Sequence, residues 1–432
     1  MINISESYYI LFLHVVYLLR ELFQQIGPLA NFEIEAFRFF DHIKTPWIYT
    51  RDILEIAAMP FFLARKEPNA LDTAMPEYKT SILIDLSYMK DPYRGYGQIA
   101  LNYGNYFKEN YNLQTSDYKL TLLLPKKYFG IFGNEVNYIS SSNWFRKHCH
   151  YLFPKFDIWH NLQFPVRFKP YSKSTKYIFT IHDLNVLSLE YERNQKHVTR
   201  NYRRLSEHIK RASVITTISD FSKKQIEKHF NLEGKRLVLI YNGVEEISTK
   251  PASKPNFQIE KPFFFSISAF RPKKNFHVLL DMMKLMPDKY LYIAGNNKTE
   301  YGRLIKNRIE TEGINNAVLL GTISEEEKIW LYASCEAFLF PSLLEGFGLP
   351  VIEAMQFGKP VFSSRETSLK EIGGDFAYFW DNFDPQEMKQ LIDENLEKFY
   401  QDKDLVQKEK EYAKSFSYEK HFEEYEKLYS TI

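Results

Sequence analysis

Cysteine is scarce in this chain of 432 residues, which contains only Cys149 and Cys335. Two cysteines so far apart provide neither a disulfide framework nor the paired spacing of a zinc site. They fit a reducing compartment, and we expect both to be structural thiols. A hydrophobic run long enough to cross a bilayer is also lacking, because the apolar stretch at residues 8–19 is too short and is broken by His14.

A dominant charge of either sign is missing as well. Lys and Arg number 56 against 54 Asp and Glu, so the net charge gives no argument for nucleic-acid binding. No nucleic-acid motif, internal repeat or low-complexity tract appears in the sequence. The chain is too long for one hydrophobic core, and its 44% apolar content can form sizeable cores, so we expect two domains.

Residues 1–78 differ from the rest of the chain. A basic start and a small-residue cleavage site are both absent, which argues against a cleaved signal peptide. The pattern predicts helices at residues 8–25, 32–43 and 50–65. These helices either pack on the body of the protein or lie in a membrane interface, and the sequence leaves both alternatives open.

Residues 341–358 (PSLLEGFGLPVIEAMQFG) combine several features of a ligand site. Residues 336–340 predict a short buried strand before the loop, and the apolar spacing after Pro350 predicts a helix. We expect Gly346 and Gly348 to take positive φ and to let the backbone approach a ligand, and Pro350 suits the first helical turn. The free N–H groups of such a helix start favour a phosphate.

Two carboxylates flank this predicted phosphate position. Glu345 lies in the loop and Glu353 one turn into the helix, so each can accept hydrogen bonds from hydroxyl groups on one side of the phosphate. That is the layout of a sugar nucleotide, in which a diphosphate separates a sugar from a ribose. Considered singly, either residue could instead be a solvated charge.

The motif EGFGLPVIEA resembles the Glu-x7-Glu motif of retaining glycosyltransferases of the GT-B fold, in the large family 4 (glycosyl transferases group 1). The resemblance covers about residues 80–430. It implies that Glu345 contacts the donor sugar and Glu353 the ribose. It also implies an α/β fold with two Rossmann-like doubly wound domains facing a cleft, and residues 1–78 add a helical N-terminal extension.

The alternation of short apolar runs with helical segments agrees with this fold. The predicted strands are residues 80–86, 118–124, 156–159, 177–181, 213–218 and 236–240, then 263–267, 290–294, 317–320, 337–340, 360–363 and 376–379. The predicted parts are an extension (1–78), an N-terminal acceptor domain (79–245), a linker (246–261), a C-terminal sugar-nucleotide domain (262–410) and a C-terminal helix crossing back to the N-terminal domain (411–432).

Further candidate site residues lie at strand ends of the first domain. Gly95 and Gly97 open a predicted helix after the first strand, where a phosphate or an acceptor can approach backbone N–H groups, although packing glycines are a nearly equal alternative. The resemblance implies that this loop lines the cleft. His182, in the segment TIHDL, resembles the family residue near the donor sugar and diphosphate. We expect Asp183 to cap the next turn, and His160 stays open between a structural and a functional role.

The turn SAFRPKKNFHVLL follows the first strand of the second domain. The resemblance implies an Arg and a Lys here for the donor diphosphate. Lys274 matches the Lys, whereas Ala269 stands at the Arg position, so Arg271 is the candidate replacement. The backbone of Gly346, Phe347, Gly348 and Leu349 would complete the donor-binding set, with His182, Lys274 and Glu345 as the catalytic candidates.

No Asp-x-Asp follows a strand, so we expect neither a metal ion nor a cofactor beyond the nucleotide-sugar donor. The basic run at residues 191–211 is either a solvated face or a surface for an anionic membrane or a lipid-phosphate acceptor. We expect transfer of a hexose-type sugar to a glycan or lipid-linked acceptor in cell-surface polysaccharide synthesis. The expected location is the cytoplasm, with peripheral association at the inner face of the membrane left open. A GT-B sugar-nucleotide epimerase and a catalytically silent membrane scaffold stay open, the latter supported only by Ala269.

Overall fold

The computed structural model describes residues 80–90, 95–141, 153–166, 168–187, 194–260 and 262–432. Residues Tyr78–Ile432 form one compact unit. The predicted extension at residues 1–78 lies outside the described residues, as do Cys149 and Arg193.

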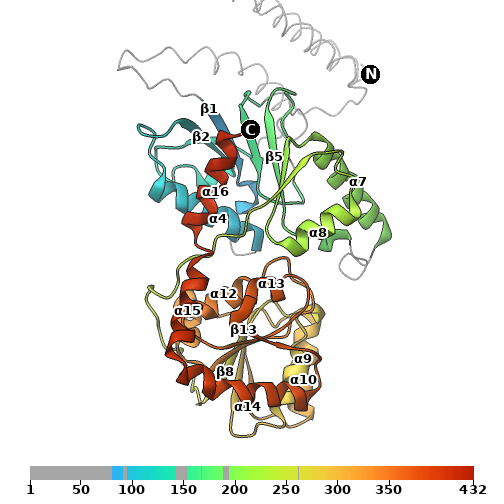
Figure 1. The fold of residues 1–432 in the computed structure, drawn as a ribbon, viewed down its shortest axis with the longest axis vertical. Helices are drawn as coiled ribbons and strands as arrows, with labels where there is room; N and C mark the ends of the chain where they lie inside the picture. The colour runs from blue at the N-terminus through green and yellow to red at the C-terminus, as the bar shows by residue number, and fades with distance from the viewer. Residues whose placement is uncertain (1–79, 91–94, 142–152, 167, 188–193, 261) are drawn as a thin grey trace, which may run out of the picture. The chain divides into compact units, whose positions relative to one another are not determined.

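The first sheet has seven parallel strands in the order β3-β2-β1-β4-β5-β6-β7 (Figure 1). The strands are β1 (Thr80–Asp85), β2 (Tyr118–Leu124), β3 (Asn137–Ser140), β4 (Ile158–Asn161), β5 (Lys176–Ile181), β6 (Val214–Thr217) and β7 (Arg236–Leu239). Six of them were predicted, although β4 begins and ends two residues later than expected. β3 was missed because this edge strand begins and ends with polar residues and has no fully buried member.

The second sheet has six parallel strands in the order β10-β9-β8-β11-β12-β13. They are β8 (Phe263–Ile267), β9 (Tyr290–Ala294), β10 (Ala317–Gly321), β11 (Ala337–Phe340), β12 (Val361–Ser364) and β13 (Ala377–Trp380). This is the strand order of a Rossmann-like doubly wound sheet, and the first sheet has the same order with one strand added. The predicted fold class is therefore confirmed.

Helices lie between the parallel strands, and the last three follow β13. They are α4 (Gly95–Asn110), α7 (Gln195–Arg211), α8 (Asp220–His229), α9 (Phe276–Met283), α10 (Glu300–Thr311), α11 (Glu325–Ser334), α12 (Leu349–Gln356), α13 (Leu369–Gly373), α14 (Pro385–Gln401), α15 (Lys403–Lys414) and α16 (Tyr418–Ser430). Among the 3-10 turns are η1 (Ser87–Lys90), η4 (Asn185–Leu187) and η5 (Pro272–Lys274). Polar side chains fix several helix starts; Ser219, for example, caps α8 by accepting from Ser222 N.

Both faces of each sheet are buried. Along β8, Phe263 and Phe265 belong to one hydrophobic cluster, whereas Phe264 belongs to another on the opposite face. Along β1, Ile82 and Leu83 divide between two clusters in the same way. This burial on both sides explains why the strands read as continuous apolar runs rather than as alternating patterns.

The chain ends in two helices rather than in the single helix predicted from Glu411. α15 ends at Lys414, and the backbone then crosses near Val244, whose N–H donates to Phe416 O at 2.7 Å. α16 packs beside α4 on the first sheet (Figure 1), where Phe422 stacks on Tyr106 with ring centroids 3.7 Å apart. The helix breaks here because the chain must leave one sheet for the other.

A buried polar network fixes α16 to the first sheet. His160 Nδ1 lies 2.8 Å from the Tyr429 hydroxyl, and His160 Nε2 lies 2.9 Å from Thr180 Oγ1. His421 Nε2 lies 2.6 Å from the Tyr103 hydroxyl. Burial lowers the pKa of His160 to about 3 and that of His421 to about 4, so both rings are neutral. His160 is thus a structural residue.

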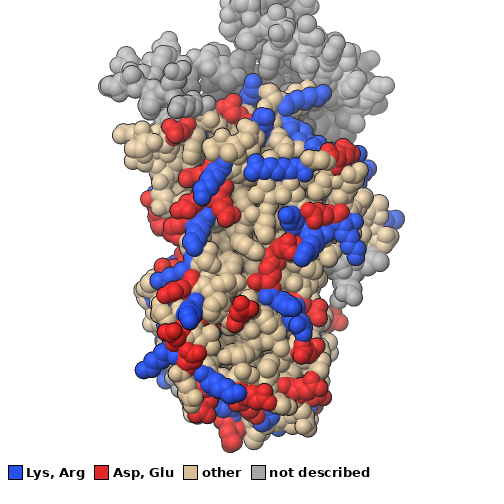
Figure 2. All heavy atoms as spheres, in the orientation of Figure 1, with Lys and Arg blue, Asp and Glu red and all other residues tan. Residues whose placement is uncertain are grey.

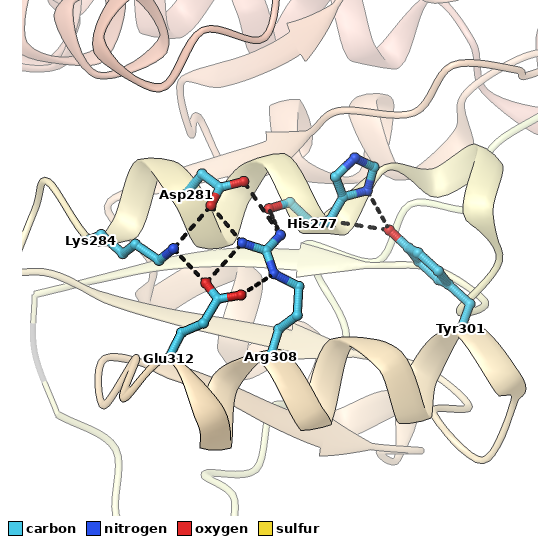
Figure 3. Close-up of polar contacts among 6 residues, drawn as sticks. All are labelled: His277, Asp281, Lys284, Tyr301, Arg308 and Glu312. Carbon is cyan, nitrogen blue, oxygen red and sulfur yellow. Dashed lines mark hydrogen bonds and ion pairs between the residues drawn. The ribbon is translucent and has the colours of Figure 1, made fainter.

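An ionic network joins α9 to α10 in the second domain (Figure 3). The Arg308 guanidinium contacts Asp281 Oδ1 at 2.6 Å and Glu312 Oε1 at 2.7 Å, and Lys284 bridges the same two carboxylates. α9 follows η5 directly, so this network anchors the helix that continues from the Lys274 turn.

Candidate donor-binding site

Two loops of the second domain meet where its strand order reverses. β8 pairs with β11, so η5, which follows β8, and the Glu345 loop, which follows β11, leave the same edge of the sheet. Open α/β sheets bind ligands at this switch point. The Lys274 ammonium and the Glu345 carboxylate form an ion pair there, with side chains only 12% and 14% exposed. Leu343 N donates to Lys273 O at 2.8 Å and ties the two loops together.

The Glu345 loop is held by its own hydrogen bonds. Glu345 N donates to Thr367 Oγ1 at 3.1 Å, and Ser368 Oγ donates to the carbonyls of Glu345 at 3.1 Å and Phe347 at 2.9 Å. The Phe347 ring is buried against Tyr241, so its side chain belongs to the core. Only the backbone of Phe347 is therefore available as the donor contact that we predicted.

The two glycines of the loop have different reasons to be glycine. Gly348 has φ +119° and precedes α12, as predicted, and Pro350 lies in the first turn of that helix. Gly346 does not have a positive φ, so that prediction was wrong. A Cβ at Gly346 would instead lie 3.0 Å from His182 O and 3.1 Å from Asp183 Cβ. Close approach to these two residues is thus what requires glycine.

His182 lies beside the Glu345 loop and follows β5 of the first sheet. Its Nε2 donates to Leu162 O at 2.7 Å, which leaves Nδ1 as an acceptor. Burial lowers the pKa of His182, so the ring is neutral. The His182 carbonyl accepts from Ser222 Oγ at 2.7 Å, and Asp183 Oδ1 accepts from Asn185 N at 2.9 Å, which confirms Asp183 as a turn cap.

Glu353 is an anchored carboxylate rather than a solvated helix charge. Its Oε2 accepts from the Tyr332 hydroxyl at 2.8 Å, and its Oε1 lies 3.4 Å from Lys328 Nζ. Tyr332 and Lys328 lie one turn apart on α11, facing α12. We did not predict a role for either residue. The only sign of it in the sequence is that the two lie four positions apart, on one face of a helix.

The η5 turn places Lys274 at the site and brings a second lysine, which we did not predict, next to it. Ala269 and Arg271 are both exposed, whereas Lys273 is half-buried next to Lys274. Burial, and then the charge of Lys274, lower the pKa of Lys273, which also interacts electrostatically with Glu345 and Asp183. Lys273 therefore joins the site as a cation that we missed, although the doublet in PKKN was its visible signal. The assignment of Arg271 to a phosphate stays a prediction.

The structure gives the positions of the other predicted residues, but their roles in donor binding stay predictions. Gly95 begins α4, as expected, and Gly97 is buried in its first turn, but the loop at residues 91–94 is not described. Leu349 begins α12 and is half-buried. Across the described residues no group of three His, Cys, Asp or Glu side chains is placed to hold a metal ion. Metal independence stays a prediction.

Two family models cover the two domains in turn. The model described as Glycosyltransferase Family 4 matches residues 105–246, and the model described as Glycosyl transferases group 1 matches residues 249–416. The chain belongs to this family of glycosyltransferases. The second match includes Lys274, Glu345 and Glu353, so the site described above lies in the group 1 part of the family.

Curated relatives of this glycosyltransferase include enzymes of O-antigen assembly. O-antigen chain mannosyltransferase B of Escherichia coli is 29% identical over 211 residues, which are 46% of this chain and 55% of that protein. O-antigen chain mannosyltransferase RfbU of Salmonella typhimurium is 30% identical over 158 residues, which are 36% of this chain and 43% of that protein. The chain thus spans about half the length of these relatives.

Solved structures share the fold over both domains. Sucrose-phosphate synthase from Thermosynechococcus elongatus has a TM-score of 0.63 at 16% identity, covering 82% of this chain and 98% of that chain. Anabaena Alr3699/HepE in complex with UDP and glucose has a TM-score of 0.60 at 17% identity, covering 82% and 100%. At such identities the likeness shows the GT-B fold of two Rossmann-like domains.

Proposed function

We propose that this glycosyltransferase moves a hexose-type sugar from a nucleotide-diphosphate sugar to a glycan or lipid-linked acceptor in cell-surface polysaccharide synthesis. The observation that carries the proposal is the spacing of Glu345 and Glu353 on either side of the Gly348 start of α12, with Lys274 paired to Glu345. The names of the O-antigen mannosyltransferase relatives and the UDP and glucose in the HepE complex support the substrate class.

The proposed chemistry depends on charge that grows on the departing diphosphate. Fixed positive groups and backbone N–H groups stabilise such charge without reorganising. Lys274 and Lys273 lie at the η5 turn, and this turn contacts the Glu345 loop, which leads into α12. A diphosphate would compete with Glu345 for the Lys274 ammonium and free that carboxylate for the hydroxyls of the sugar.

His182 and Glu353 would fix the two ends of the donor. The neutral His182 ring offers Nδ1 as an acceptor beside the Glu345 loop, where the sugar would lie. Glu353, one turn along α12, would accept hydrogen bonds from the ribose. We propose that transfer retains the anomeric configuration and needs neither metal nor cofactor, as the resemblance implies.

We also propose that the acceptor is met at an anionic membrane surface on the cytoplasmic side. None of the helices in the described part of the chain is long and apolar enough to cross a bilayer. Acidic and basic side chains are interspersed on the face shown in Figure 2. The 56 Lys and Arg of the whole chain nearly balance its 54 Asp and Glu, so attraction to an anionic surface requires a local group of basic residues. α7 carries such a group, with Lys196, Arg200, Arg203 and Lys210 exposed.

Two arginines of α7 contribute less to its exposed positive charge than the sequence suggested. The Arg204 guanidinium donates to Val166 O at 2.5 Å, and Arg211 donates to Ser172 O at 2.6 Å and Thr175 O at 3.1 Å. Both side chains are thus engaged with the first domain. The membrane proposal therefore rests on the four exposed cations of the helix.

A panel of sugar nucleotides tests the proposed function. A donor present at 100 times its dissociation constant stabilises the fold by about 2.7 kcal/mol, which a thermal-shift measurement detects. The donor so found is then incubated with and without glycan acceptors. Transfer only with an acceptor supports the proposal, whereas an epimer or free nucleotide formed without acceptor indicates an epimerase. No binding to any donor indicates a silent scaffold.

A further inference from the structure

We propose that Tyr332 is a positioning residue that makes the nucleotide site selective for ribose by holding Glu353. This inference rests on the proposed function, because it assigns Glu353 to the ribose. It concerns a buried hydroxyl of α11 that no part of the proposed chemistry uses. The Tyr332 hydroxyl donates to Glu353 Oε2 at 2.8 Å.

Tyr332 itself cannot move easily. Its side chain is fully buried, and its ring stacks on Phe357 at an interplanar angle of 12°. The ring also packs edge-on against Phe265, with centroids 5.1 Å apart. Burial raises the pKa of Tyr332 well above its usual value, so the hydroxyl keeps its proton and stays a donor. The position of Glu353 Oε2 is thus fixed by a rigid group.

The other oxygen of Glu353 is held more loosely. Oε1 lies 3.4 Å from Lys328 Nζ, and the same ammonium lies closer to Glu325 Oε2, at 2.7 Å. A carboxylate accepts about four hydrogen bonds, so Oε1 keeps acceptor capacity. The Glu353 side chain is 18% exposed, which is enough for a ligand to reach it. Oε1 is therefore the oxygen that meets the ribose hydroxyls.

The consequence is a preorganised acceptor. A carboxylate that rotates freely must lose that freedom when it binds a diol, whereas one held through Oε2 has lost it before binding. Removing the Tyr332 hydroxyl would weaken only ligands that donate to Glu353. A nucleotide without ribose hydroxyls gains no affinity from this hydrogen bond, so its affinity should not change when the Tyr332 hydroxyl is removed.

The test compares each nucleoside diphosphate that binds the wild-type protein with its 2′,3′-dideoxy analogue by calorimetry. For Tyr332→Phe we expect affinity for the ribonucleotide to fall about fivefold to tenfold, with no change for the dideoxy analogue. Tyr292→Phe is the matched control, since that buried hydroxyl of the same core accepts from Glu260 N at 2.9 Å, far along the chain from Glu353. It should leave both affinities unchanged.

A double substitution separates positioning from general loosening of the core. In a Glu353→Ala background, Tyr332→Phe should cause no further loss of ribonucleotide affinity. An equal loss for both ligands, or no loss for either, would overturn the positioning role while leaving the proposed function intact. If the wild-type protein binds no nucleoside diphosphate at all, the proposed function fails and this inference fails with it.

Discussion

Lys274 and Glu345 pair at the switch point of the second sheet, although they lie 71 positions apart in the sequence. Both side chains are mostly buried, so a ligand that contacts one of them must disturb the ion pair. A donor diphosphate supplies the negative charge that can take over the ammonium. The pair is therefore where we expect binding and turnover to be separable by mutation.

Lys274→Ala should lower turnover more than it weakens donor binding. The ammonium meets more negative charge in the transition state than in the ground state. The measurement is kcat together with the donor dissociation constant. Lys289→Ala is the matched control, because Lys289 pairs with Glu336 at 2.6 Å in the same domain and has no assigned contact with the donor. Equal losses in both quantities would mean that Lys274 only anchors the ground-state phosphate.

Glu353→Ala should weaken nucleotide binding by about 1.5 to 3 kcal/mol, the usual contribution of hydrogen bonds to a charged group. Calorimetry with the nucleoside diphosphate alone measures this loss without any catalysis. Glu336→Ala removes a comparable ion-paired carboxylate elsewhere and should leave nucleotide affinity unchanged. An unchanged affinity for Glu353→Ala would refute the ribose assignment.

The buried histidines should make the stability of the fold sensitive to mild acid. The folded-state pKa of His160 is about 3 and that of His421 about 4, below the ordinary value of 6.5. The unfolded chain therefore binds more protons below pH 6.5, and stability falls as the pH drops toward these folded values. Each histidine contributes a slope of about 1.4 kcal/mol per pH unit in this window.

Urea unfolding between pH 7.5 and pH 4.5 tests this prediction. His160→Gln should be less stable at pH 7.5, because it alters the hydrogen bonds to Tyr429 and Thr180, but its stability should fall less steeply with acid. His197→Gln, at an exposed position of α7, should keep the wild-type slope. Identical slopes for all three proteins would contradict the assignment.

Glu409 on α15 should destabilise the fold at neutral pH. Its carboxylate is fully buried and has no hydrogen-bond partner among the residues that the structure describes, and burial raises its pKa well above the ordinary value. A raised folded-state pKa means that stability is fully present below about pH 4.5 and is lost as the pH rises toward the folded value. Glu409→Gln should therefore raise the melting temperature, and by more at pH 8 than at pH 5. Glu411→Gln, exposed on the same helix, should change it at neither pH.

The exposed cations of α7 predict salt-dependent membrane association. Each basic residue near an anionic surface can add about 1 kcal/mol of attraction. We expect the protein to co-sediment with anionic vesicles in low salt and to be released by high salt. Lys196→Glu with Arg200→Glu should abolish this binding without changing turnover on a water-soluble acceptor. Equal binding to neutral and anionic vesicles, or to neither, would show that α7 is a solvated face.

The sequence alone determined the elements with strong local patterns. Strands such as β8 and β9 were predicted to the residue, because a strand buried on both faces must be a continuous apolar run bounded by turns. The turn at Gly348 and the helix after it were predicted from glycine and proline, whose backbone preferences are local. Family resemblance added roles for Glu345, Glu353 and Lys274, but not their geometry.

Only the tertiary structure decided which residues meet. Gly346 is glycine because His182, which is distant in sequence, lies 3.0 Å from where its Cβ would be. Lys273 is partly buried like Lys274, whereas Arg271 of the same turn is exposed. Tyr332 reaches Glu353 because α11 packs beside α12, and the final helix breaks after Lys414 because the chain must change sheets. Such contacts leave no local periodicity in the sequence, since they depend on packing between segments that fold far apart along the chain.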